Sequence, residues 1–291
     1  MPFSTTSRFI RQLPQVACHQ PVSSQFAVKF WGVRGSVPTP GQATARYGGN
    51  TACVEVLIAN QRLILDGGTG LRVLGEQLQS QQPVTAHLFF THTQWDRIQG
   101  FPFFLPAFTP GNRFKIYGAI APNGASIKQR LSDQMLRPSF SVPIQAMQAE
   151  LEFCNLAAGS LLRIGEVIVE TISLNQATQA LGYRISWQGR SLVYATDTNP
   201  EKIDQNLLYL AQQADVLIYD GTYADATYHA APTAAPWKIG LALAKAAEVS
   251  RVIMFHHSPM QTDSALDELE DCLQQQFDCV MLAREGLSIQ L

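Results

Sequence analysis

Two successive series of short apolar runs constrain the fold of this chain more than any other feature of its sequence. The runs hold four to eight residues, many of them β-branched or aromatic, and glycine, proline or polar residues separate them. This pattern is typical of β-strands. The first series is Phe26–Trp31, Ala52–Ala59, Arg62–Leu65, His87–Phe90 and Arg113–Tyr117. The second is Leu151–Cys154, Glu166–Ser173, Ala180–Trp187, Ser191–Tyr194, Val216–Tyr219, Val252–Phe255 and Cys279–Leu282. We therefore predict two β-sheets.

Amphipathic helices are predicted between and after the strands. Apolar residues recur at spacings of three and four over Asp204–Ala214 and Ser264–Phe277, and Ile127–Leu136 also has helical character. Two sheets with helices outside them are the economical way to bury the apolar faces of these elements. A chain of 291 residues can bury one large core. We expect one domain over residues 26–291, preceded by an arm over residues 1–25.

Composition narrows the classes of partner. The formal net charge is −2 and no stripe of lysine and arginine stands out, so no nucleic acid is expected as a partner. Charged residues make up 15% of the chain, against roughly 25% in typical soluble proteins, and such a surface favours self-association, for example as a homodimer. No apolar run approaches the roughly 18 residues of a membrane span. We expect a cytoplasmic protein with reduced cysteines.

The segment Thr91–Gly100 has the arrangement of a metal-binding loop with altered ligands. It follows an apolar run, where the pattern His-x-His-x-Asp-His would place three imidazoles and a carboxylate around two cations. This chain has His92, Gln94, Asp96 and Arg97 at those four positions. Two of the four are therefore residues that we do not expect to bind a metal ion.

These residues and five further segments resemble the metallo-β-lactamase fold superfamily, in particular its phosphodiesterase-like branch related to the tRNA 3′-processing ribonucleases. The resemblance runs from about Lys29 to the C-terminus. Its markers are Phe30–Ser36, Tyr47–Thr51, Leu65–Gly70, Thr91–Gly100, Tyr194–Asp197 and Phe255–Pro259. The resemblance implies an α/β fold, a four-layer αββα sandwich with a metal cleft along one edge of the sheets. In active relatives, two ions would hold a hydroxide and lower its pKa for attack on a phosphorus or carbonyl centre.

The resemblance also assigns ligand positions one by one. The remaining ligand types are His92, Asp96, Asp197, which matches the bridging carboxylate, and His256, the last imidazole. Positions that hold histidine in the family hold Gln94, Arg97 and Gln176 here, and a further histidine position near Thr233–Ala235 is also without one. His229, a few residues upstream, has the wrong offset to replace it.

The substitutions have direct physical consequences. A glutamine amide is a poor ligand for Zn²⁺, which prefers imidazole, thiolate or carboxylate. A guanidinium stays protonated and has no lone pair to donate, so Arg97 places a fixed cation where a metal ion would lie. Asp96 and Asp197 would repel each other without a cation between them. We therefore predict that Arg97 pairs with Asp96 and Asp197 and replaces the second metal ion.

Other residues near these motifs are open to two interpretations. Arg34 and Asn50 either line the cleft and contact an anionic ligand or stabilise a structural loop. His257 either contacts a ligand or supports the neighbouring His256. The aromatic stretch Phe101–Phe108 beside the metal loop is expected to pack in the core or against a second subunit.

Two hypotheses on function follow. The first is a degenerate metallo-β-lactamase-fold protein without a dinuclear centre, cofactor or hydrolytic activity, kept as a binding or regulatory protein for an unknown protein or a small anionic ligand. The alternative is a phosphodiesterase-like hydrolase in which Asp96 serves catalysis. It would hold one Zn, Mn or Fe ion on His92, Asp96, Asp197 and His256.

Overall fold

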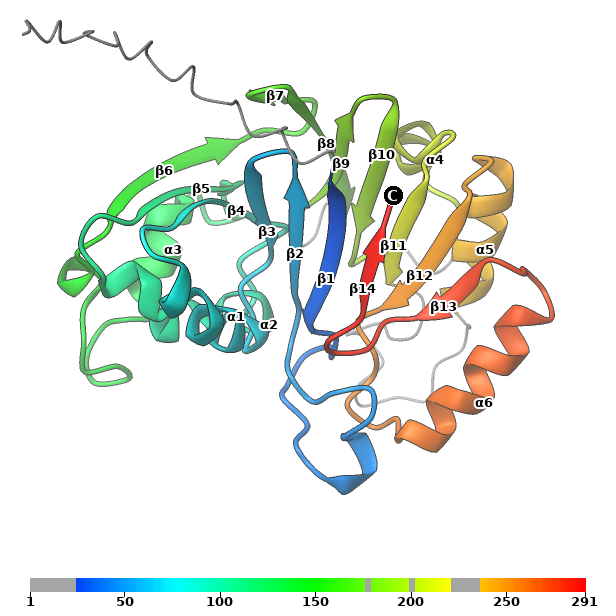
Figure 1. Cartoon of the computed structure of the whole chain (residues 1–291), viewed down its shortest axis with the longest axis horizontal. Coiled ribbons are helices and arrows are strands. Elements are labelled where there is room, and N and C mark those ends of the chain that lie inside the picture. Colours follow the sequence, from blue (N-terminus) through cyan, green and yellow to red (C-terminus); the bar gives the residue numbers. More distant parts are fainter. Residues whose placement is uncertain (1–24, 176–178, 199–201, 221–235) are drawn as a thin grey trace, which may run out of the picture.

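A computed structural model describes residues 25–175, 179–198, 202–220 and 236–291. The described residues form two seven-stranded sheets that pack face to face, with helices on both outer faces (Figure 1). The predicted αββα sandwich is confirmed. The described residues do not include 1–24 of the expected arm, Gln176, His229 or 233–235.

The first sheet is mixed. Its order is β14-β1-β2-β3-β4-β5-β6, antiparallel from β14 to β3 and parallel from β3 to β6. The bounds are β1 (Phe26–Gly32), β2 (Cys53–Ile58), β3 (Gln61–Leu65), β4 (Thr85–Phe90), β5 (Arg113–Ala119), β6 (Glu150–Leu156) and β14 (Ser288–Gln290). The parallel half matters for function, because it brings the carboxyl ends of β3 and β4 to the same edge.

The second sheet repeats this plan. Its order is β13-β12-β11-β10-β9-β8-β7, and β10, β11, β12 and β13 run parallel. The bounds are β7 (Leu161–Ile164), β8 (Val167–Asn175), β9 (Ala180–Trp187), β10 (Arg190–Ala195), β11 (Val216–Asp220), β12 (Arg251–Phe255) and β13 (Val280–Leu282). The carboxyl ends of these four consecutive parallel strands therefore meet at one edge.

The core between the sheets is rich in aromatic rings. Phe89 stacks on Tyr117 with ring centroids 4.5 Å apart and meets Tyr183 edge-on at 5.4 Å. Helices close the outer faces, each by an apolar side. The first sheet is covered by α1 (Gly70–Leu78), α2 (Trp95–Ile98) and α3 (Ile127–Asp133), and the second by α4 (Gln205–Ala211), α5 (Pro236–Ala246) and α6 (Asp263–Gln274). No helix within the described ranges has the length and apolar character needed to cross a bilayer.

One strand was assigned to the wrong series. The run Leu151–Cys154 was predicted in the second sheet, but β6 pairs parallel with β5 in the first, with Tyr117 opposite Cys154. Long connections hide which strands are neighbours, because a parallel pair needs a crossover of a dozen or more residues. The edge strands β7 and β14 were not predicted, and each is only three or four residues long.

The segments that follow β3 and β4 are in close backbone contact. A Cβ on Gly68 would lie 2.4 Å from Thr51 Oγ1 and 2.6 Å from the Asp96 carbonyl oxygen. A Cβ on Gly100 would lie 1.9 Å from the Gly68 carbonyl oxygen. Only glycine permits this approach of the two backbones. The loop after β3 is thereby held against the loop after β4, where the predicted metal ligands lie.

Candidate functional site

Five strand ends converge to form the candidate site. Asp66 follows β3, His92 follows β4, Asp197 follows β10, Asp220 ends β11 and His256 follows β12. In open α/β sheets, ligands bind outside the carboxyl ends of parallel strands. Asp66, Asp197 and His256 have φ angles of 60°, 59° and 62°, which is uncommon for residues other than glycine. Such backbone conformations are frequent at functional sites, where they aim a side chain.

Arg97 lies at the centre of this edge and is fully buried. Its Nη1 is 3.2 Å from Asp66 Oδ2, its Nε is 3.2 Å from Asp96 Oδ2 and its Nη2 is 3.7 Å from Asp197 Oδ1. We call these four residues the ion cluster. Burial alone would lower the pKa of Arg97, but the carboxylates of Asp197, Asp96 and Asp66 outweigh burial and raise it. The predicted pairing of Arg97 with Asp96 and Asp197 is present.

Asp66 anchors the cluster to the framework. Its carboxylate accepts hydrogen bonds from the Thr91 backbone N–H at 2.8 Å and from the Tyr194 hydroxyl at 2.8 Å. Asp66 thereby holds the start of the loop that follows β4 in place. The sequence did not predict its ion pair with Arg97, which ties the guanidinium to a third carboxylate.

Two imidazoles border the ion cluster. His92 Nε2 contacts Asp197 Oδ2, and His256 lies between two carboxylates, with Nδ1 2.9 Å from Asp220 Oδ2 and Nε2 3.1 Å from Asp96 Oδ2. Burial and Arg97 each lower the pKa of His256, but the contacts with Asp220 and Asp96 outweigh them and raise it to about 10. In the metal-free protein, this shift favours the protonated imidazole of His256.

The two acidic ligand positions carry charge despite their burial. Burial alone would raise the pKa of Asp96, but Arg97 and His256 hold it well below its usual range. Burial likewise works against ionisation of Asp197, and His92 and Arg97 outweigh it, so its pKa is lowered. Both carboxylates are already neutralised by side chains of the protein itself.

Asp220 is a site residue that the sequence interpretation missed. It is buried, and its Oδ2 accepts a hydrogen bond from the Asp197 backbone N–H at 3.0 Å. Its Oδ1 has no hydrogen-bond partner among the described residues. Burial, which outweighs the attraction of His256, raises its pKa. Its signal in the sequence was an aspartate that ends an apolar strand, one strand before His256.

The donor set fits one metal ion better than two. Ligand atoms of Asp197, Asp220 and His256 lie within 4.8 Å of one another, so this trio could hold a single ion. A second ion on Asp96 would lie against a buried guanidinium whose Nε and Nη2 have no hydrogen-bond partner among the described residues. If the Arg97 guanidinium moved away, three buried carboxylates would lose their counter-charge. The residues present therefore do not fit a dinuclear centre.

Gln94 and Arg34, two further residues of the predicted site, lie in different environments. Gln94 is exposed at the start of α2, and its backbone N–H donates to His92 Nδ1 at 3.2 Å, so its side chain is not part of the ion cluster. Arg34 is fully buried and donates to the carbonyls of Gly48, Ser258 and Gln261, which favours its structural interpretation. The ligand interpretation of Arg34 does not fit this burial.

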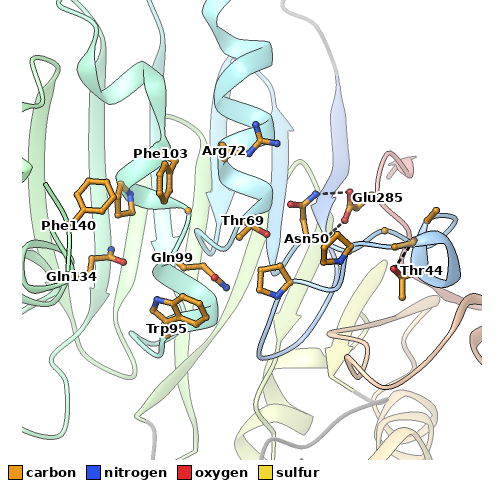
Figure 2. Close-up of a pocket in the computed structure, with 18 of the residues that line it drawn as sticks. Thr44, Asn50, Thr69, Arg72, Trp95, Gln99, Phe103, Gln134, Phe140 and Glu285 are labelled. Atoms are coloured by element: carbon orange, nitrogen blue, oxygen red, sulfur yellow. Dashed lines mark hydrogen bonds between the residues drawn. The ribbon is translucent and has the colours of Figure 1, made fainter. Parts of the chain in front are cut away.

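His257 and Asn50 also differ from each other. His257 is fully buried with Nε2 2.7 Å from the Ala283 carbonyl oxygen, and burial lowers its pKa to about 3. A ligand cannot reach it in this conformation, so it supports the fold. Asn50 instead lines a cavity of about 740 Å³ beside α2 (Figure 2). We call this space the α2 cavity; its lining includes Asn50, Arg72, Trp95, Gln99, Phe103, Gln134, Phe140 and Glu285.

Replacing Arg97 by methionine tests the role of the ion cluster. Arg97→Met keeps the length of the side chain but leaves Asp66, Asp96 and Asp197 buried without their cation. We expect the free energy of unfolding, measured in urea, to fall by about 3–5 kcal/mol. Arg113→Met is the matched control, because the Arg113–Glu150 pair is exposed and should contribute little. Equal effects of the two substitutions would contradict a structural ion cluster.

The neighbouring histidines should titrate at opposite extremes. In metal-free protein, NMR titration should find His256 protonated until the pH approaches about 10 and His257 neutral until the pH falls near about 3. Because the folded pKa of His256 is raised, its stabilising contribution is complete below the unfolded pKa of about 6.5. That contribution is lost as the pH rises towards 10. Titration of both imidazoles near pH 6.5 would refute the described contacts.

Comparisons with known proteins agree with this geometry. The family profile described as the beta-lactamase superfamily domain matches residues 61–257. The ribonuclease Z of Thermoplasma volcanium is 24% identical over 285 aligned residues, covering 83% of this chain and 90% of the relative. A diphosphatase from the PhnP family has a TM-score of 0.68 at 16% identity, covering 92% of this chain and 98% of its own. The metallo-beta-lactamase fold protein YhfI from Bacillus subtilis has a TM-score of 0.65 at 16% identity, and the match covers 92% of this chain and 100% of the YhfI chain. The chain therefore belongs to the metallo-beta-lactamase superfamily, as a distant homologue of ribonuclease Z.

Proposed function

We propose that this protein is a degenerate member of its superfamily, without a dinuclear metal centre or two-metal hydrolysis, that has been kept as a binding or regulatory protein. The observation that carries the proposal is the buried Arg97 guanidinium within 3.2 Å of Asp96 and Asp66. Two-metal hydrolysis requires two ions that clamp the attacking and leaving oxygens. Arg97 supplies positive charge at this place but has no open coordination position.

The state of the carboxylates supports the same proposal. A carboxylate that binds a metal ion gives its lone pairs to the ion, whereas Asp96 is shared between Arg97 and His256. Recruiting a second ion would mean expelling a guanidinium that has no access to solvent. A buried ion pair resists this, because removing one partner leaves an uncompensated charge. The fold is thus held together at this edge by its own side chains.

A single-metal hydrolase is the second candidate, and the trio Asp197, Asp220 and His256 favours it. When bound, a divalent ion would polarise an ester or phosphodiester and activate a water molecule. Asp220 would add a carboxylate ligand that the sequence interpretation did not include, and its Oδ1 is free to accept this role among the described residues. His92, in contact with Asp197, would orient that carboxylate.

Metal content and turnover separate the two candidates. We expect protein purified without chelator to hold clearly less than one metal ion per chain and to show no EDTA-sensitive hydrolysis of bis(p-nitrophenyl) phosphate. If the single-metal candidate holds, there will be one ion per chain, lost in Asp220→Asn and kept in the control Asp215→Asn, whose carboxylate pairs with Arg190 outside the site. Two ions per chain would overturn the main proposal.

Restoring the missing imidazoles tests whether Arg97 is what excludes the ions. The triple variant Gln94→His, Arg97→His, Gln176→His should gain bound Zn²⁺ in equilibrium dialysis, because imidazole is a preferred zinc ligand. The double variant Gln94→His, Gln176→His keeps the guanidinium and should gain little. If both variants gain zinc equally, Arg97 does not exclude the metal.

A further inference from the structure

We infer that the α2 cavity is a binding site for a small, uncharged aromatic molecule that carries amide-like hydrogen-bonding groups. The inference rests on the proposed function, because it names a ligand class for a protein proposed to bind rather than to hydrolyse. It stands on the residues around the α2 cavity, which contains none of the ion cluster.

Aromatic side chains form one end of the α2 cavity (Figure 2). Trp95 is 61% exposed and Phe103 is 51% exposed, although both are large apolar residues. Phe140 meets Phe103 edge-on, with ring centroids 5.5 Å apart and planes at 84°. Apolar side chains gathered at the surface around a hollow mark binding sites in soluble proteins. A planar ring inserted here would gain contact with three aromatic surfaces.

Amide side chains lie among these rings. Gln134 donates from Nε2 to the Ile98 carbonyl at 3.1 Å, and Gln99 donates from Nε2 to Thr51 Oγ1 at 2.9 Å. Figure 2 shows Gln134 between Phe140 and Trp95, and Gln99 beside Trp95. Because each amide is held by a hydrogen bond to the framework, its carbonyl oxygen has a defined direction. A pocket with apolar walls and a few fixed polar groups is typical of small-molecule sites.

The charged residues of the α2 cavity are neutralised by neighbours. Arg72 pairs with Glu76 at 2.5 Å. Glu285 accepts hydrogen bonds from the backbone N–H of Asn50 at 2.6 Å and from Asn50 Nδ2 at 3.0 Å. Arg72 and Glu285 also oppose each other in sign. The cavity therefore offers no net positive charge to a phosphate or a polyanion. An uncharged ligand fits it better than the anionic ligand that the sequence led us to expect.

The size of the α2 cavity agrees with a compact ligand. Its volume of about 740 Å³ lies within the roughly 300–1,000 Å³ of small-molecule pockets. The cavity also shares α2 with the ion cluster: Trp95 and Gln99 line the cavity, while Asp96 and Arg97 are buried in the cluster. A ligand that contacts Trp95 therefore touches the four-residue helix that positions Arg97.

The test uses N-acetyl-L-tryptophanamide as a neutral aromatic amide, with indole-3-acetate and tryptamine as its anionic and cationic counterparts. Binding to the full chain in EDTA is measured by isothermal titration calorimetry and by the NMR shift of the Trp95 indole N–H. We expect a dissociation constant of roughly 0.1–1 mM for the amide. The anion should bind at least about tenfold more weakly, because Arg72, the cationic side chain among the described residues that line the cavity, is already paired with Glu76.

Variants localise the binding. Trp95→Ala and Phe103→Ala should each weaken binding of the amide by about tenfold or more, since aromatic anchors dominate such sites. Tyr209→Ala is the matched control, because Tyr209 is 72% exposed on α4 and does not line the α2 cavity, so binding should stay unchanged. All three side chains are exposed, and unchanged unfolding midpoints would establish that the variants fold.

The outcomes distinguish this inference from the proposed function. Absence of saturable amide binding up to about 10 mM, equal binding by Trp95→Ala, or tighter binding of indole-3-acetate would each overturn the α2 cavity assignment. None of these results changes the metal content, which is measured on the same preparation before EDTA is added. Conversely, two metal ions per chain together with amide binding would overturn the proposed function and leave the ligand site in place.

Discussion

The buried contact of one guanidinium with three carboxylates decides the character of this protein. Asp66, Asp96 and Asp197 come from the segments after three different strands, and Arg97 joins all three. Like charges at this density would otherwise repel one another in a region with little water. The same positive charge that stabilises the edge of the sheets would repel a metal ion placed beside it. The proposed absence of a dinuclear centre and the stability of this edge therefore both depend on Arg97.

The sheet topology explains why these groups meet at all. Strands β3 and β4 run parallel in one sheet, and β10, β11 and β12 run parallel in the other. Their carboxyl ends place Asp66, His92, Asp197, Asp220 and His256 at a common edge, although these residues are spread over 191 positions of the chain. The arrangement is general to the fold, and the chemistry depends on which side chains occupy it.

The sequence was sufficient for the layers and most strands of the core, because these follow from local apolar patterns, and for the Arg97 pairing, because the family resemblance placed Asp197 beside the loop that carries Asp96 and Arg97. It was insufficient where long-range geometry decides. Asp220 ends an ordinary apolar strand, and only its parallel pairing with β12 reveals its contact with His256. Arg34 stood in a promising loop but is buried against carbonyls of the segment after β12. The α2 cavity is formed by segments from Pro38 to Glu285, which no local pattern connects.

The close crossing of Gly68 and Gly100 gives the two halves of the loop different freedom to change. At Gly100 even a methyl group would collide with the carbonyl of Gly68, whereas His92, Gln94, Asp96 and Arg97 carry four chemically different side chains on the preceding stretch. The close contact at Gly68 and Gly100 thus constrains the main-chain path, and it does not involve the side chains of His92 to Arg97. A protein engineer who wanted new chemistry at this edge could keep the main-chain path set by the two glycines, but would have to replace Arg97 together with its carboxylate partners to avoid leaving buried charges unpaired.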